Sequence, residues 1–201
     1  MIKGEKARLD VHNILYSIYK FNRTLNNPKI LKIIDKSKTE DIAFINNVTL
    51  NSMRLQFHTL KIIQKYIKKK LRINEKILLI SATTQIVFLG FKEYAVINCT
   101  VEIAKKLKIY HGLVNSVLKK ISADKSKLKK TKIKFDDLPN WFVKKTSYFS
   151  KFEQNKFINN FHLEPDIHIV FKNAKKLNNF EKKIIKTSDI SGFIEDKINI
   201  K

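Results

Sequence analysis

The chain has 201 residues, of which 41 are Lys or Arg and 18 are Asp or Glu, so its formal net charge is +23. This length suits one domain, or one domain with a small second one, and the 43% hydrophobic content excludes wholesale disorder. With only 4 Gly and 3 Pro, the composition favours long helices over a β-sandwich or a β-barrel.

The positive charge is tolerated most easily if the binding partner is a polyanion. The competing explanation is an AT-rich genome, whose codons favour Lys, Asn and Ile and raise the charge without any binding role. Lys-rich charge fits both explanations. Basic residues outnumber acidic ones on both sides of residue 122, so the charge is not confined to one tail.

Several classes of protein are excluded. A single cysteine, Cys99, excludes an intramolecular disulfide framework and a multi-cysteine zinc site. The longest aliphatic run, residues 77–80, is too short to cross a membrane, and residues 1–10 lack the apolar stretch of a signal peptide. We therefore expect a cytoplasmic protein without a membrane partner.

Apolar periodicity close to 3.6 residues predicts helices throughout the first 121 residues. Thr39 is the expected N-cap of the longest helix, Pro28 the expected first-turn residue of a short one, and Gly90 the expected end of another. The predicted helices cover residues 6–21, 28–36, 39–70, 75–89, 93–107 and 111–121.

Residues 75–89 are apolar nearly all round, which is typical of a helix at the centre of a bundle. A buried strand over "QIVFLGF" is the alternative. From residue 125 to 134 the chain has six lysines and no acid, so we predict a solvated basic linker over 125–136. Beyond it, residues 138–152 and 153–162 predict two short helices, and the alternation of 166–172 predicts a strand.

Signatures of catalysis are nearly absent. The four glycines are far apart, so no glycine-rich phosphate or dinucleotide loop exists, and the five histidines show no HExxH spacing. Cys99 falls on the apolar face of a predicted helix, where a buried, inert thiol is expected. We therefore expect no catalytic residue, metal or cofactor.

Basic residues gather near the ends of the predicted helices. Phosphate contacts supply sequence-independent affinity for nucleic acid, and lysines at helix ends provide such contacts; the alternative is a set of solvated helix ends. The candidate RNA-binding residues are Lys3, Lys6, Arg8, Lys68, Lys69, Lys70, Arg72, Lys105, Lys106, Lys119 and Lys120.

The order of several segments resembles the NusB-type helical domain. These segments are "EKARLDVHNILYSI", "LLISATTQIVFLGFKEYAVIN", "EYAVINCTVEIAKKL" and "HGLVNSVLKKI". That domain occurs alone as an antitermination factor and at the N-terminus of bacterial 16S rRNA cytosine-C5 methyltransferases of the RsmB (Sun/Fmu) type. "LPNWFVKKTSYF" and "PDIHIVFKN" are similar to segments that follow the domain only in the methyltransferases, so the resemblance favours that lineage.

The resemblance also shows what is missing. The catalytic module of the methyltransferases needs a glycine-rich S-adenosylmethionine loop and two cysteines, and this sequence has neither. "ISGFIEDKINIK" is similar to the segment just before that module, so we interpret the chain as a truncated product, an engineered fragment or a degenerate paralogue. We expect no activity from this chain alone.

The resemblance assigns roles to single residues as well. Gly112 and Asn115 belong to a pattern shared by an enzyme family and a non-enzymatic factor, so they are expected to be structural, Gly112 for close helix entry and Asn115 for a buried polar bond. Lys119 stands where the methyltransferase pattern has arginine. Lysine keeps the positive charge but lacks the planar guanidinium, which can donate two parallel hydrogen bonds. Phe171 stands where the strand pattern has arginine, which argues against an RNA contact there.

The expected fold is an all-α, NusB-like bundle over residues 1–124, followed by the linker and a small, mainly helical α+β segment over 137–201. The expected function is binding of RNA, in particular rRNA, with Lys3, Lys6, Arg8, Lys119 and Lys120 on one phosphate-binding face. The first alternative is a NusB-type antitermination factor that binds a ribosomal or transcription-complex protein. The second is a transferase that is active through an unrecognised site.

Overall fold

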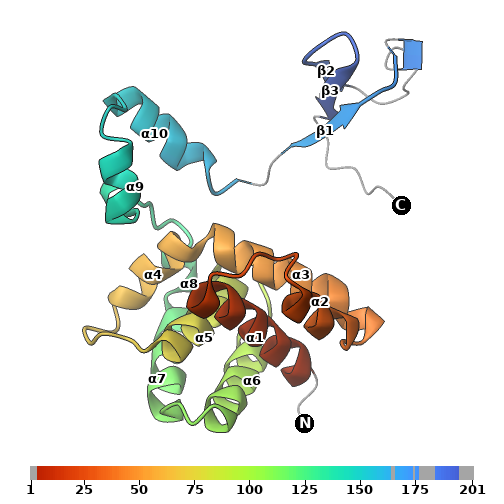
Figure 1. Cartoon of the computed structure of the whole chain (residues 1–201). Helices are drawn as coiled ribbons and strands as arrows, with labels where there is room; N and C mark the ends of the chain where they lie inside the picture. Colours follow the sequence, from red (N-terminus) through yellow and green to blue (C-terminus); the bar gives the residue numbers. More distant parts are fainter. Residues whose placement is uncertain (1–3, 164–165, 174, 177–183, 195–201) are drawn as a thin grey trace. The chain divides into compact units, whose positions relative to one another are not determined.

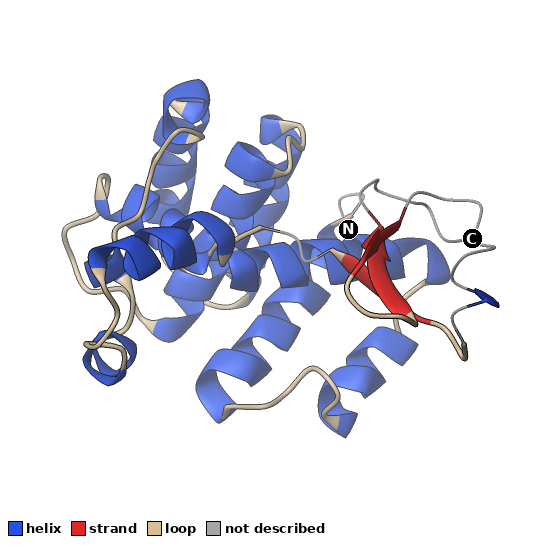
Figure 2. Cartoon of the chain, turned by 90° about the horizontal axis from the view of Figure 1, so that it is seen from above, coloured by secondary structure: helices blue, strands red, loops and turns tan. Residues whose placement is uncertain are grey.

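The computed structural model describes residues 4–163, 166–173, 175–176 and 184–194. The chain divides into two compact units, residues 1–161 and residues 162–201. Among the described residues, the first unit is built of helices and the second contains a small antiparallel sheet (Figures 1 and 2). The predicted helical bundle followed by a small mixed segment is thus confirmed.

Most predicted helices lie close to their predicted positions. At the start of α2, the Asn27 side chain accepts a hydrogen bond from the backbone N–H of Lys29 at 3.1 Å, and Pro28 takes the first-turn position. The helices of the bundle are α1 (Glu5–Phe21), α2 (Pro28–Asp35), α3 (Thr39–Arg54), α4 (Gln56–Gln64), α5 (Ile73–Thr83), α6 (Glu93–Lys106) and α7 (His111–Ala123).

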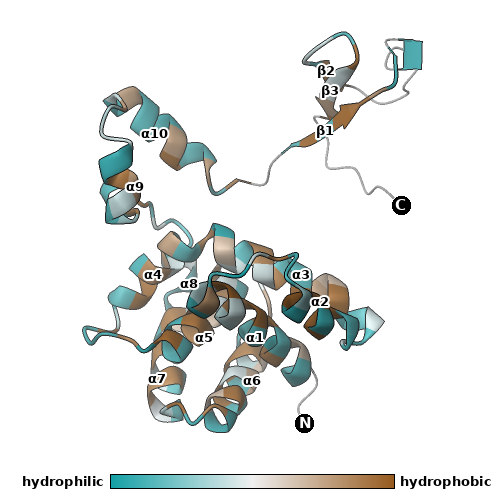
Figure 3. Cartoon of the chain, in the orientation of Figure 1, coloured by the Kyte–Doolittle hydropathy of each residue, from teal (hydrophilic) through white to brown (hydrophobic). Residues whose placement is uncertain are grey.

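The predicted single helix from Thr39 to about Lys70 is wrong, because α3 and α4 meet at a break. Leu55 lies between them with φ −98° and ψ 12°, and its side chain is buried. Apolar side chains on both sides of the break face the core, so the periodicity runs through it. The N-cap is Lys38 rather than Thr39. Lys68, Lys69 and Lys70 therefore lie in the α4–α5 loop, which is hydrophilic in Figure 3, and not at a helix end.

The centre of the bundle is α5, as its composition predicts. Every residue from 77 to 83 is buried, with Leu79 fully buried, and the two large hydrophobic clusters of the bundle both include side chains of α5. The helix continues into a π-helical turn, η1 (Thr84–Phe88), and stops at Gly90, whose φ of 69° suits glycine. The alternative of a strand over "QIVFLGF" is wrong.

The basic segment after α7 is attached to the bundle. It begins with α8 (Lys125–Leu128), and Leu128 and Ile133 are buried. The short 3₁₀ turn η2 (Phe135–Asp137) adds Phe135 to a third hydrophobic cluster, which includes Phe57 of α4 and side chains of α9 (Asn140–Lys145) and α10 (Lys151–Asn160). The first compact unit therefore extends through the predicted linker to residue 161.

The second unit contains a sheet in the order β1-β3-β2, with both pairs antiparallel. The predicted strand at 166–172 is confirmed as β1 (Ile167–Val170), whereas β2 (Ile184–Lys186) and β3 (Ser191–Ile194) lie in a stretch that showed little pattern. Gly192 of β3 sits so close to Ile184 that a Cβ atom would lie 2.2 Å from its Cγ2, so this position requires glycine.

His12 generates a testable pH dependence. It is buried on α1, and desolvation lowers the pKa of its imidazole from 6.5 to about 4, while a hydrogen bond with Asn74 acts in the opposite direction. The unfolded chain therefore binds a proton at His12 more readily than the folded chain does. The contribution of neutral His12 to stability is fully present above pH 6.5 and is lost as the pH falls towards 4. We expect a loss on the order of 3 kcal/mol, measured by urea unfolding, that is absent in His12→Gln. Equal pH dependence in both proteins would contradict this assignment.

Candidate nucleic-acid interface

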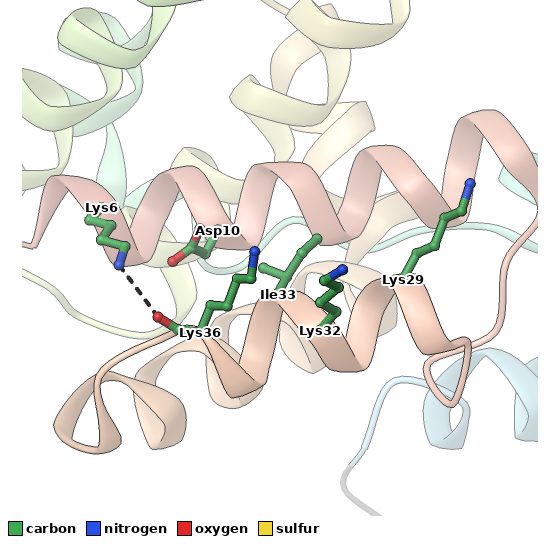
Figure 4. A pocket seen from close by; sticks show the side chains of 6 residues that line it. All are labelled: Lys6, Asp10, Lys29, Lys32, Ile33 and Lys36. Carbon is green, nitrogen blue, oxygen red and sulfur yellow. Dashed lines mark hydrogen bonds between the residues drawn. The ribbon is translucent and has the colours of Figure 1, made fainter.

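A groove between α1 and α2 is lined by four lysines, one from α1 and three from α2 and its C-cap, with the carboxylate of Asp10 near Lys6 and Lys36 (Figure 4). Its volume is about 360 Å³. We call it the lysine groove, and its lining residues are Lys6, Asp10, Lys29, Lys32, Ile33 and Lys36.

Helical spacing explains why these side chains meet. Lys6 and Asp10 are four residues apart on α1, and the groove residues of α2 and its C-cap follow one another at steps of three, one and three, so each set shares one helix face. Ile30 of α2 is fully buried against apolar residues of α1, which fixes α2 on the bundle. The Lys6 ammonium donates to the carbonyl of Lys36 at 3.5 Å, at the negative C-terminal end of α2.

The lysine groove carries excess positive charge. All four lysines are exposed, and none forms an ion pair with a carboxylate in the described part of the chain. The Asp10 carboxylate accepts a hydrogen bond from the Ser37 hydroxyl at 3.2 Å. Burial raises the pKa of Asp10, and the Ser37 hydrogen bond and the Lys6 charge act against that rise. The groove therefore offers several accessible ammonium groups, which suits a polyanion.

Arg8 has a different environment from its neighbour Lys6. Its guanidinium is half-buried, donates from Nε to Oε1 of Gln85 at 2.8 Å, and donates to the carbonyl of Gly4 at 3.1 Å. It also lies over the ring of Phe44, 5.0 Å from the centroid. Burial lowers the pKa of Arg8. The expectation of a phosphate contact at Arg8 therefore needs correction, because its donors are used inside the bundle.

Three predicted lysines form ion pairs within the chain. The Lys106 ammonium pairs with the buried carboxylate of Glu5, and Lys105 pairs with Glu102 at 2.6 Å. Lys69 pairs with Glu75 at 3.4 Å. Lys106 is thereby corrected to a structural role, since removing it would leave a buried carboxylate without this counter-charge.

A second basic hollow, of about 470 Å³, lies between the α4–α5 loop and the α6–α7 loop. It brings Lys69 and Arg72 of the predicted loop cluster close to Lys108 and to the 70% exposed ring of Tyr110. Lys68 and Lys70 are exposed in the same loop. Glu75 also lines this hollow, and its carboxylate accepts from the backbone N–H of Arg72 at 2.9 Å, so the start of α5 is already occupied by an anion.

A comparison with protein families identifies the bundle. The model of the NusB family matches residues 5–123, which is more than half of the chain and runs from the first residue of α1 to the last residue of α7. The chain belongs to the NusB family. This family is in general associated with RNA binding, protein binding and transcription antitermination. A search of curated proteins found no match to the sequence.

Two ion pairs show at which end of α6 the predicted basic residues lie. Glu5 at the start of α1 pairs with Lys106 at the end of α6, whereas Glu93 at the start of α6 pairs with Lys125, just after α7, at 2.6 Å. The 14 residues of α6 span roughly 20 Å between these two ends. Lys6 and the exposed pair Lys119–Lys120 are therefore near opposite ends of α6, so a shared phosphate-binding face would have to extend along this helix.

The structure revises the two motif residues of α7. Asn115 is half-buried, and its side chain has no hydrogen bond to a described residue, so the expected buried polar bond is not formed. Gly112 does not need positive φ; a Cβ atom there would lie 3.1 Å from the exposed ring of Tyr110. The close neighbour of Gly112 is thus the ring of Tyr110, near the start of α7.

Three groove lysines, Lys29, Lys32 and Lys36, were not among the RNA-binding residues predicted from the sequence. The available signal was their spacing of three and four residues on a short helix, and it becomes meaningful only with Lys6 opposite. The predicted contact Lys3 lies outside the described residues.

The described residues contain no group of three or more His, Cys, Asp or Glu side chains that could hold a metal ion. Cys99 is fully buried, and burial raises the pKa of its thiol, which agrees with the expected inert cysteine. None of the helices described here is long and apolar enough to cross a membrane.

The internal role of Arg8 can be tested against Lys6. Arg8→Met keeps the aliphatic stem and removes the donors to Gln85 and Gly4, so we expect the free energy of unfolding to fall by about 1–3 kcal/mol. RNA affinity of the folded variant should stay unchanged. Lys6→Met is the matched control, with stability preserved and RNA binding weakened. Preserved stability with weaker RNA binding in Arg8→Met would restore Arg8 as an RNA contact.

Asn115→Ala tests the revised role of that residue. Because no hydrogen bond is lost and alanine favours helix, the free energy of unfolding should change by less than about 0.5 kcal/mol in urea unfolding. Leu118→Ala on the same helix removes a fully buried side chain, so it should cost about 2–5 kcal/mol. A comparable loss in the two variants would reinstate a buried polar role for Asn115.

Proposed function

We propose that this NusB-family protein binds RNA through the lysine groove and contributes no methyl-transfer chemistry of its own. The observation that carries the proposal is the set of four exposed ammonium groups, from two packed helices, without ion pairs to described carboxylates. Phosphates are the natural ligands of such a set, and they give affinity that does not depend on base sequence. The general association of the family with RNA supports RNA over DNA.

The finer part of the proposal is a relation to rRNA methyltransferases, which makes rRNA the expected ligand. It rests on the similarity of "LPNWFVKKTSYF" and "PDIHIVFKN" to methyltransferase segments. These stretches contain α9 and β1, outside residues 5–123. Because the sequence lacks a glycine-rich loop and has one cysteine, we propose that the chain neither binds S-adenosylmethionine nor transfers a methyl group.

The alternative is an antitermination factor that holds RNA together with a ribosomal or transcription-complex protein. The family match supports it, since that match covers the bundle and ends at residue 123. The two proposals differ in a simple measurement. An RNA-binding module retains affinity alone, whereas the alternative factor binds RNA tightly only when its protein partner is added.

Other predicted lysines remain proposed phosphate contacts. Lys68, Lys70 and Arg72 are exposed at the second hollow or in the loop beside it, and Lys119 and Lys120 are exposed near the far end of α6. Lys3 stays a sequence-based proposal. A long RNA could contact several of these positions at once, whereas the binding of a short hairpin depends mainly on one of them.

The lysine groove predicts a particular salt dependence. Each phosphate contact contributes roughly −0.7 to −0.9 to the slope of log K against log salt, so Lys32→Ala with Lys36→Ala should make the slope shallower by about 1–2. All RNAs should be weakened alike, because phosphates carry no sequence information. The measurement is a salt titration of fluorescence anisotropy with one short RNA hairpin.

The matched control is Lys119→Ala with Lys120→Ala, which removes the same charge at the far end of α6. Its slope of log K against log salt should equal that of the wild type. If instead the groove variant keeps the wild-type slope and the control variant has a shallower one, the hairpin binds at the far end of α6 and the groove proposal fails.

A further inference from the structure

Three large aromatic side chains of α9, α10 and their connection point into solvent. Trp141 is 64% exposed, Tyr148 is 78% exposed and Phe152 is 75% exposed. All three lie within a stretch of 12 residues, outside the part of the chain that matches the NusB family. Exposed rings of this size, so close together in the sequence, suit a ligand with flat apolar surfaces.

A separate set of rings, more deeply buried, holds this stretch to the bundle. Phe135 anchors the third hydrophobic cluster, with ring centroids 6.0 Å from Phe142 and 6.2 Å from both Phe149 and Phe157. These partly buried rings alternate with exposed ones along the chain. Trp141 and Tyr148 touch this cluster edge-on, with ring centroids 5.8 Å from Phe142 and 5.1 Å from Phe149, yet most of their surface remains in solvent.

Positive charge accompanies the exposed rings. Lys144 and Lys145 lie three and four residues after Trp141, and Lys156 lies four residues after Phe152, so each lysine lies on the same side of its helix as a ring. Together with Lys151, they are all exposed. No Lys or Arg in the described part of the chain covers the three rings, since the cation–π contacts there are those of Arg8 and Arg23.

The acidic residue of this stretch does not cancel the charge. Glu153 is the one acid between residues 138 and 160, and its carboxylate accepts from the Ser150 hydroxyl at 2.8 Å and from the Ser150 backbone N–H at 2.7 Å. These hydrogen bonds hold the pKa of Glu153 below its usual value and fix it at the start of α10. The surface therefore presents rings and ammonium groups together.

We propose that α9 and α10 form a second RNA-binding surface, on which Trp141, Tyr148 and Phe152 stack on the bases of single-stranded RNA while the adjacent lysines contact its phosphates. Base stacking on aromatic rings combined with basic side chains is how proteins bind single strands without sequence preference. Aromatic rings are enriched in protein–protein interfaces as well, but lysine is depleted there, so the lysines beside the rings favour RNA over a protein partner. A duplex is disfavoured, because its bases are already stacked on one another.

Trp141 is the single tryptophan of the chain, so it reports directly on stacking. A short single-stranded oligoribonucleotide should quench the tryptophan fluorescence in a saturable way, whereas an abasic ribose-phosphate strand of equal length should not. Tyr148→Ala and Phe152→Ala should each weaken binding by about 5- to 100-fold. Tyr94→Ala, which removes a 65% exposed ring on α6, is the matched control and should leave binding unchanged.

The same titration in the Lys32→Ala, Lys36→Ala background separates the two sites. Persistent quenching there supports a surface that works independently of the lysine groove. RNA binding by anisotropy without any quenching overturns the stacking proposal and leaves the groove proposal intact. Unchanged RNA binding in the aromatic variants, with self-association of the wild type lost in sedimentation, would assign these rings to protein contacts and overturn the proposal as well.

Discussion

The inward position of Arg8, with its hydrogen bond to Gln85, goes together with the apolar face of α1 and leaves the opposite side of that helix for the lysine groove. A half-buried guanidinium must keep its donors satisfied, and Arg8 meets this need at Gln85 of η1 and at the carbonyl of Gly4. Each helical residue turns by about 100°, which places Lys6 and Asp10 about 200° from Arg8. The inward arginine thereby turns the lysine and the aspartate towards α2.

The third hydrophobic cluster explains why the bundle does not end with its family domain. α7 ends at Ala123, but Phe135 and the rings that surround it reach Phe57 of α4. The ion pair between Lys61 of α4 and Asp137, at 2.6 Å, reinforces this attachment. Residues after the family domain are therefore held on the surface of α4 by apolar contacts, and this places the aromatic surface of α9 and α10 on the same body as the NusB domain.

Features that depend on one segment alone could be predicted from the sequence. The nearly all-round apolar character of residues 75–89 identifies a central helix, and Pro28 and Gly90 mark helix boundaries through their own backbone preferences. Features that depend on a partner could not. The break at Leu55 is invisible to periodicity, because both flanking faces are buried. Arg8 and Lys6 are two cations only two residues apart, and nothing in the sequence shows that one bonds to Gln85 while the other faces α2.

The π-helical turn after α5 has a consequence for how the domain tolerates changes in chain length. The backbone N–H of Leu89 reaches the carbonyl of Thr84 at 3.0 Å, and that of Phe91 reaches the carbonyl of Gln85 at 3.1 Å, so this turn holds one more residue than an α-helical turn. Loss of a single residue here would relax the turn to an ordinary helix and rotate the Gln85 amide away from α1. We therefore expect a change of chain length to disturb the bundle more at this turn than in the exposed loop between α4 and α5, even though both are connections between helices.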